Sequence, residues 1–270
     1  MTVYVGTSGW QYDHWRTRFY PKDIPKARWL EYYAERFSVV ESNNAFHRLP
    51  KPETFEDWAR RTPDDFLFTV KVSRWLTHIK RLKEPAEPVA RFLEHSRHLG
   101  AKLAPVLLQL PPTLRADLDA LEGTLRRFAG SVRVAVEFRH PTWFTDECRQ
   151  LLEHHEAALC LADGELGLGS DKAASRPVSP LWRTTDWGYV RFHHGAATPA
   201  PCYGRTALNS WARRISELWT QSDDVFAFFN NDGGACALRD AITFAGYVEK
   251  FGLPAARVTS ARDVKVSLRG

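Results

Sequence analysis

The chain alternates short apolar runs with segments of helical periodicity. Eight runs have the apolar composition of buried strands, and polar residues close nearly all of them; the runs are Val3–Val5, Val39–Val40, Phe68–Val70, Val106–Leu108, Val132–Phe138, Leu159–Leu161, Tyr189–His193 and Val225–Phe229. Helix-like segments separate most of these runs, which favours parallel βα units over a half-solvated antiparallel sheet. The pattern therefore predicts an α/β fold, a (β/α)8 TIM-type barrel.

The segments between the runs carry the apolar stripes of helices. Stripes recur at Trp29–Phe37 and at Leu114–Phe128, and further helices are expected at 53–61, 86–98, 145–154, 206–220 and 236–250, with Thr206 as an N-cap. Residues 164–185 are rich in glycine, serine, proline and charge, so we expect the sixth helix to be degraded or replaced by a loop. We expect one barrel domain at 1–252, followed by a basic tail at 253–270 whose order the sequence leaves open.

Side-chain parity places polar groups on the inward face of the expected strands. Alternate residues of a strand share a face, so Arg133, Ala135, Glu137 and Arg139 share one face of their run. In a barrel this face lines the interior. The opposite face, which carries the bulky apolar side chains, packs under the helices. The polar groups that end the runs are therefore predicted to converge at the carboxyl ends of the strands, where such barrels build their active sites.

Charge, hydropathy and cysteine content limit the classes of protein to which this chain can belong. The net charge of +5 and the pI of about 9.1 suit an anionic substrate or nucleic acid. No apolar run approaches the length that spans a membrane, and no basic and apolar leader opens the chain. Four scattered cysteines, Cys148, Cys160, Cys202 and Cys236, form no CxxC pair, so we expect reduced thiols without a zinc site. A cytoplasmic protein with no membrane partner is expected, and its oligomeric state stays open.

Several motifs resemble a known family. They are Gly6–Trp10 with Tyr12 and Trp15, Val40–Pro50, Phe66–Lys71, Leu107–Pro112, Ala135–Trp143, Tyr189–His193 and Phe229–Asp232. Together they resemble the YecE-like family (domain of unknown function 72) from about residue 3 to residue 250. The resemblance implies a TIM-type barrel but no particular reaction. The chain departs from the family at His47, where members commonly have Tyr, and in the run Gly233–Arg239.

The strand ends supply the candidate site residues. The predicted catalytic residues are Glu41 and Glu137, either of which could be a general base, and His193 as a general acid. Lys71, Arg139 and Arg191 are predicted to bind an anion and to stabilise charge in the transition state. The remaining predicted binding residues orient the substrate or wall the pocket, and they are Asn43, Gln109, Asn230, Asp163, Asp232, Trp10, Phe46, His78 and Trp143.

Two other interpretations of these charges stay open. Glu41 and Glu137 could simply neutralise the three cations in a buried structural network. Glu41, Glu137, Asp163 and His193 also match the ligand types of a divalent metal, but no HxH, HExxH or DxD spacing supports a metal site. We therefore expect neither metal nor another cofactor.

The sequence favours an enzyme that acts on a small anion. The expected function is metal-independent acid–base chemistry, by a hydrolase, lyase or isomerase, on a phosphorylated or carboxylated substrate. The alternatives are a protein that binds or processes nucleic acid through its basic surface and loop tryptophans, and a barrel that binds a ligand without turning it over. The distinctive charges lie at strand ends rather than along a surface stripe, which favours the first interpretation.

Overall fold

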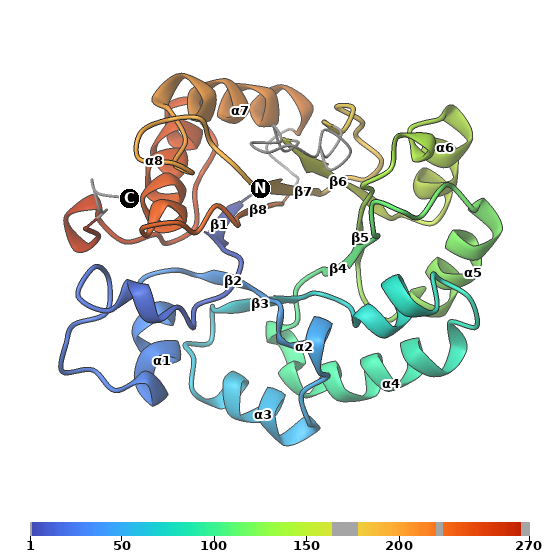
Figure 1. The fold of residues 1–270 in the computed structure, drawn as a ribbon, viewed down its shortest axis with the longest axis horizontal. Coiled ribbons are helices and arrows are strands. Elements are labelled where there is room, and N and C mark those ends of the chain that lie inside the picture. The colour runs from blue at the N-terminus through green and yellow to red at the C-terminus, as the bar shows by residue number, and fades with distance from the viewer. Residues whose placement is uncertain (1, 164–177, 220–223, 266–270) are drawn as a thin grey trace. The chain divides into compact units, whose positions relative to one another are not determined.

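The computed structural model describes residues 2–163, 178–219 and 224–265, and strands alternate with helices along them (Figure 1). The strands are β1 (Val3–Thr7), β2 (Val39–Ser42), β3 (Leu67–Val70), β4 (Val106–Gln109), β5 (Val134–Glu137), β6 (Ala158–Ala162), β7 (Gly188–Phe192) and β8 (Val225–Phe229). The helices are α1 (Trp29–Ala34), α2 (Asn44–His47), α3 (Pro52–Arg60), α4 (Ala86–Ser96), α5 (Leu118–Phe128), α6 (Asp146–His154), α7 (Arg205–Leu218) and α8 (Cys236–Lys250). All eight predicted runs form strands, and the predicted α/β class of the TIM type is confirmed.

The prediction for the sixth helix falls largely on residues 164–177, which lie outside the described part of the chain. Residues 178–187, which are described, contain no helix and lead directly into β7.

The chain divides into two compact units. The first unit comprises residues 1–41, 61–66 and 186–270, and the second comprises residues 42–60 and 67–185. The predicted single domain with a boundary at residue 252 stays a prediction.

Four parallel strand segments form the sheet of the first unit. β1 pairs with β8 and β8 pairs with β7, so that Val5 and Val190 both lie opposite Ala227. Ser8, just beyond β1, bridges in parallel to Glu41 of β2. The segments are thus ordered β2, β1, β8, β7, and their carboxyl ends lie at one edge. Outside the sheet, α7 packs beside α8 (Figure 1).

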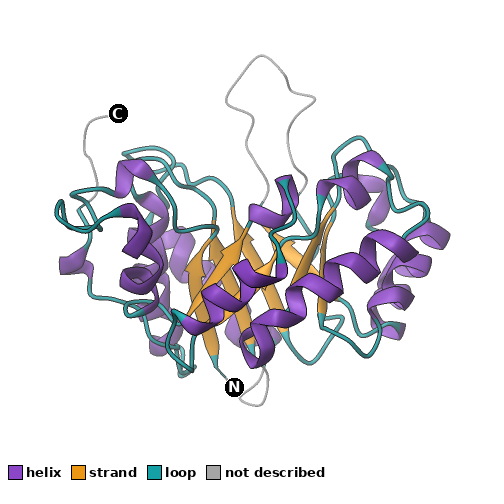
Figure 2. Ribbon diagram, turned by 90° about the horizontal axis from the view of Figure 1, so that it is seen from below, coloured by secondary structure: helices purple, strands orange, loops and turns teal. Residues whose placement is uncertain are grey.

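The second unit repeats the same local design. Lys71 bridges to Leu107, Gln109 of β4 lies opposite Glu137 of β5, and Val136 lies opposite Leu159 of β6, all in parallel. In Figure 1, α4 and α5 lie outside β4 and β5, and Figure 2 shows helices in purple beside strands in orange. Parallel pairing again brings the last residues of β4 and β5 to the same edge.

Capping side chains explain the starts of two helices. The side chains of Asp117 and Thr145 accept hydrogen bonds from the backbone N–H groups of Ala120 and Cys148, and so cap α5 and α6. The prediction that Thr206 caps its helix is wrong. The extended residue before α7 is Gly204, the helix begins at Arg205, and Thr206 therefore lies inside the first turn.

The inward position predicted for Arg133 is also wrong. β5 begins at Val134, one residue later, and Arg133 is exposed. The strand is shorter than its apolar run, so its alternation covers only Val134–Glu137.

The cysteine prediction needs a correction. Cys202 and Cys236 form a disulfide with their Cα atoms 4.8 Å apart, whereas Cys148 and Cys160 are buried free thiols. Their 34-residue separation gave no pairing signal, because the fold brings the segment before α7 against the start of α8.

Part of the basic tail is ordered in the first unit. The backbone of Val3 donates a hydrogen bond to Pro254 and accepts one from Ala256, and Ser38 donates to Arg257. The Arg257 side chain also pairs with Asp65. None of the helices in the described part of the chain has the length and apolar character that a bilayer crossing requires.

Candidate functional site

The deepest polar group of the first unit is an ion pair between two strand ends. The Glu41 carboxylate accepts hydrogen bonds from the Arg191 guanidinium and from the Tyr189 hydroxyl, each at 2.8 Å and each to a different oxygen. All three side chains are buried, with at most 1% of any residue exposed. Tyr189 and Arg191 lie two residues apart on β7, so they point to the same face of the sheet.

Asp232, which follows β8, lies in different surroundings. The indole Nε1 of Trp15 donates to its Oδ1 at 2.7 Å, and Nε2 of His14 lies 2.9 Å from its Oδ2. The second contact is close but poorly aligned, so Oδ2 has no well-directed hydrogen bond among the described residues. Burial raises the pKa of Asp232 to about 7, and the bond from Trp15 opposes this shift.

Four further polar residues lie at or shortly beyond the ends of β1, β7 and β8. His193 is buried, and its Nδ1 lies 3.3 Å from the Asn230 amide nitrogen. The Tyr12 hydroxyl donates to the Ser8 carbonyl, while the Ser8 hydroxyl has no hydrogen bond among the described residues. Burial raises the pKa of Tyr12, and the negative charges of Asp232 and Glu41 add to this effect. Tyr12 therefore stays a neutral phenol at physiological pH.

A buried carboxylate holds the loop that carries Asp232. Asp240 of α8 accepts hydrogen bonds from the Asn231 amide at 2.7 Å and the Tyr203 backbone at 2.8 Å, and Arg239 pairs with its other oxygen at 2.7 Å. Burial raises the pKa of Asp240 to about 6, although Arg239 and Asn231 oppose the shift. Asp240 thus links the Asn231–Asp232 turn to the segment before α7.

The second unit gathers cations around a histidine. The Lys71 ammonium lies 3.9 Å from the centre of the Phe46 ring, and the His78 ring meets the same phenyl group edge-on at 5.0 Å. The Thr77 hydroxyl lies 2.8 Å from Nδ1 of His78. Burial lowers the pKa of His78 to about 4, and the charges of Lys71, Arg139 and Arg74 add to the shift. The surroundings of His78 are therefore strongly positive.

A buried ion pair ends β5 in the same unit. Nε of Arg139 donates to the Glu137 carboxylate at 2.8 Å, and the two side chains are 11% and 1% exposed. The Gln109 amide donates to the Leu110 carbonyl at 3.3 Å, and Trp143 stacks on Phe138 with its indole N–H bonded to Leu114. Trp143 is thus a packed core residue with its polar atom satisfied.

The predicted site residues fall into both units. The first unit holds Trp10, Glu41, Arg191, His193, Asn230 and Asp232, and the second holds Asn43, Phe46, Lys71, His78, Gln109, Glu137, Arg139, Trp143 and Asp163. Asn43 has a buried amide oxygen with no hydrogen bond among the described residues, and Asp163 is half-buried after β6. The convergence of Lys71, Arg139 and Arg191 with both glutamates stays a prediction.

The sequence analysis did not predict three residues that contact predicted site residues. Tyr189 shares strand parity with Arg191 and could have been found by that signal. His14 and Trp15 contact Asp232 from more than 200 residues away, within a short 3-10 helix, Asp13–Trp15, that has no strand-end position. Among the described residues, no group of three or more His, Cys, Asp or Glu side chains is arranged to hold a metal ion.

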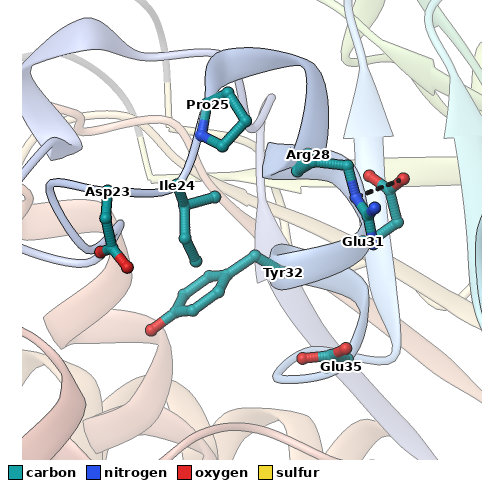
Figure 3. A pocket seen from close by; sticks show the side chains of 7 residues that line it. All are labelled: Asp23, Ile24, Pro25, Arg28, Glu31, Tyr32 and Glu35. Atoms are coloured by element: carbon teal, nitrogen blue, oxygen red, sulfur yellow. Dashed lines mark ion pairs between the residues drawn. The ribbon is translucent and has the colours of Figure 1, made fainter.

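The first unit also has a surface cavity of about 250 Å³ beside α1 (Figure 3). It is lined by Asp23, Ile24, Pro25, Arg28, Glu31, Tyr32 and Glu35. Arg28 points at Glu31, whose carboxylate also pairs with Arg61. None of the predicted site residues lines this cavity.

Comparisons with known proteins identify relatives of this chain. The UPF0759 protein YunF of Bacillus subtilis (strain 168) is 27% identical over 270 residues, covering 87% of this chain and 90% of YunF. The UPF0759 protein YecE of Escherichia coli (strain K12) is 32% identical over 143 residues, which are 53% of this chain and half of YecE.

Solved structures agree with the sequence relatives. A DUF72 family protein from Thermotoga maritima MSB8 superposes with a TM-score of 0.77 at 28% identity, covering 92% of this chain and all of that one. A DUF72 family protein from Enterococcus faecalis V583 superposes with a TM-score of 0.73 at 19% identity, covering 92% of this chain and 98% of that one, which shows the shared fold. The family model described as protein of unknown function DUF72 matches residues 4–261, and the chain therefore belongs to the DUF72 family.

Proposed function

We propose that this protein is a metal-independent acid–base enzyme, a hydrolase, lyase or isomerase, that acts on a small phosphorylated or carboxylated substrate at its strand ends. The observation that carries the proposal is the contrast between two carboxyl groups of the first unit. Glu41 is fully buried and accepts hydrogen bonds from a guanidinium and a phenol, whereas the carboxyl group of Asp232 contacts the indole of Trp15 and the ring of His14. Because burial raises the pKa of Asp232 to about 7, this group can exchange a proton near neutral pH, which acid–base catalysis requires.

The cations of the second unit support the anionic character of the substrate. Burial is the main cause of the lowered pKa of His78, and the charges of Lys71 and Arg139 add to it. Two cations close to one histidine favour an anionic ligand. Arg139 offers a planar guanidinium for a carboxylate or a phosphate, and Lys71 offers a point charge. Glu41 and Glu137 remain the candidate bases, and His193 the candidate acid.

The tryptophans favour this proposal over nucleic-acid binding. Trp10, Trp15, Trp143 and Trp187 are at most 4% exposed, so they offer no free ring face to a base. Trp75 is 52% exposed, but a single exposed ring is a small platform. We keep the cytoplasm as the proposed location, although a disulfide such as Cys202–Cys236 is uncommon there, and fractionation of cells that express the protein would test it.

The test is a search for turnover without metal. The purified protein is dialysed against EDTA and incubated with sugar phosphates, phosphate monoesters and hydroxy acids, and products are followed by NMR. We expect one class of anion to be converted, and conversion to fall in Lys71→Met but not in the exposed control Lys51→Met. Binding of DNA or RNA oligonucleotides with a steep dependence on salt, and no turnover, would replace this proposal with the nucleic-acid alternative.

A further inference from the structure

The carboxyl group of Asp232 is nine-tenths buried, yet its Oδ2 atom lacks a well-directed hydrogen bond within the described residues. Its Oδ1 atom, in contrast, receives a 2.7 Å bond from Trp15. Trp15 is fully buried and packs against Tyr12 and Tyr33, so it fixes the orientation of the carboxyl group. One oxygen is therefore anchored and the other is available for a proton.

His14 connects this available oxygen to solvent. Its Nε2 atom lies 2.9 Å from Oδ2, while 41% of the His14 side chain is exposed. A histidine that touches a buried carboxyl group with one ring nitrogen and retains solvent access is suited to moving protons. Burial lowers the pKa of His14, and the nearby Arg18, which donates to the Gly234 carbonyl, adds to this shift, while Asp232 and Asp13 oppose it.

We propose that Asp232 is the acid–base group that faces the substrate and that His14 carries protons between its Oδ2 atom and water. This assignment rests on the proposed function and deepens it, since the sequence placed Asp232 among binding residues and did not single out His14. The other described ionisable groups whose charges interact with this pair are Tyr12, Tyr20, Arg18 and Asp13.

The proton transfer balances over one cycle. A proton from water adds to Nδ1 of His14, the Nε2 proton passes to Oδ2 of Asp232, and the imidazole is left neutral with its proton on Nδ1. Asp232 then gives its proton to a lone pair of the substrate oxygen that gains charge, and returns to a carboxylate. Exchange through water moves the imidazole proton back to Nε2, so each cycle delivers one proton from water to the substrate.

The electrostatics of the pair fit this role. Because burial raises the pKa of Asp232 to about 7, the group can both donate and accept a proton near neutral pH. The neighbouring phenols Tyr12 and Tyr20 have raised pKa values and stay uncharged, so they add no competing proton step there.

The experiment combines kinetics with NMR on the whole chain. Asp232→Asn and His14→Gln are compared with two exposed controls, Asp23→Asn and His154→Gln. The substrate is the anion that the EDTA-treated natural protein converts. We expect Asp232→Asn to lower kcat by about 100-fold or more with KM kept. His14→Gln is expected to lower kcat by about tenfold and to move the pH profile, which a purely structural role would not do. The Asp232 side-chain carboxyl ¹³C resonance is expected to titrate near neutral pH and to shift in His14→Gln.

The outcomes separate this inference from the proposed function. Turnover that survives in Asp232→Asn overturns the role of Asp232 and leaves the enzyme proposal standing. Absence of turnover in the natural protein overturns the enzyme proposal, and the carboxyl titration then decides the pair. If the Asp232 carboxyl resonance titrates in the ordinary aspartate range and does not change in His14→Gln, the proposed role of the two residues is overturned. If it titrates near neutral pH and shifts in His14→Gln, the two residues are supported as a proton-exchanging site.

Discussion

The Glu41 carboxylate lies 2.8 Å from the Arg191 guanidinium, although β1 and β8 separate the two strands that carry them. The four strands must therefore curl until the inner faces of β2 and β7 meet. Their side chains close this space with a salt bridge and the Tyr189 hydroxyl, instead of with apolar groups. We therefore expect this buried pair to stabilise the first unit.

Removal of one partner of this pair should destabilise the fold. We expect Glu41→Gln and Arg191→Met each to lower the free energy of unfolding by about 3–5 kcal/mol. Arg191→Met leaves the buried Glu41 carboxylate without the guanidinium, and Glu41→Gln leaves the buried guanidinium without the carboxylate. The double variant Glu41→Leu with Arg191→Met should recover most of the loss, since both charges are then gone. Urea unfolding measures all of these variants.

The exposed pair of Arg213 and Glu217 on α7 provides the control. Glu217→Gln should change the free energy of unfolding by no more than about 0.5 kcal/mol. If Glu41→Gln were as mild as this control, the buried pair would contribute little and our view of the first unit would be wrong.

The raised pKa of Asp232 predicts how stability depends on pH. Its pKa is about 7 in the folded protein and near the ordinary aspartate value of 3.8 in the unfolded chain, so between these two pH values the folded state binds more protons. Stability should therefore fall as pH rises from about 4 to about 7, by up to about 4 kcal/mol from this group. In Asp232→Asn this component should vanish, which unfolding measured at several pH values would show.

Asp240 has a raised pKa as well, of about 6, so some loss of stability with pH should remain in Asp232→Asn. The informative quantity is the difference between the natural protein and the variant. A difference that stays constant from pH 4 to pH 8 would contradict the raised pKa of Asp232.

The sequence was sufficient to predict the features that depend on a local pattern of residues. The strand-end positions of Glu41, Glu137 and Arg191 follow from apolar runs and parity, which need no knowledge of distant contacts. The contact of Trp15 with Asp232 joins residues 217 positions apart, and no periodicity records it. The disulfide of Cys202 and Cys236 was missed for the same reason, because the approach of two loops decides it.

Phosphate binding near His78 should be coupled to proton uptake. Lys71 and Arg139 lower its pKa, so an anion that neutralises them should raise it from about 4 toward the ordinary value. Histidine NMR titrations with and without inorganic phosphate would measure the shift. Lys71→Met should raise the pKa of His78 without phosphate and weaken the effect of phosphate, while the exposed control Lys51→Met should change neither.

The protein is expected to fold and bind anions without metal. The described residues contain no cluster of ligands suited to a metal ion, and the cations near His78 would repel one. After dialysis against a chelator, elemental analysis should find well below one divalent ion per chain, with the melting temperature unchanged. About one tightly held ion per chain would instead recast Lys71 and Arg139 as partners of metal ligands.

Glu137 and Arg139 give the sharpest separation of catalysis from structure. Glutamine at position 137 can still accept the hydrogen bond from Arg139, so Glu137→Gln should retain the fold and phosphate binding while abolishing turnover if Glu137 is the base. If the pair is catalytic, Arg139→Met should mainly weaken phosphate binding. If the pair is a structural network, either change should lower the free energy of unfolding by about 3 kcal/mol or more, because it leaves a partner charged and buried. Arg149→Met, on the exposed face of α6, is the matched control. Thermal unfolding of both single variants and the double, with and without phosphate, decides between the roles. If both singles are badly destabilised, the double recovers, and phosphate changes nothing, the pair is a structural plug and Glu137 is no longer a candidate base.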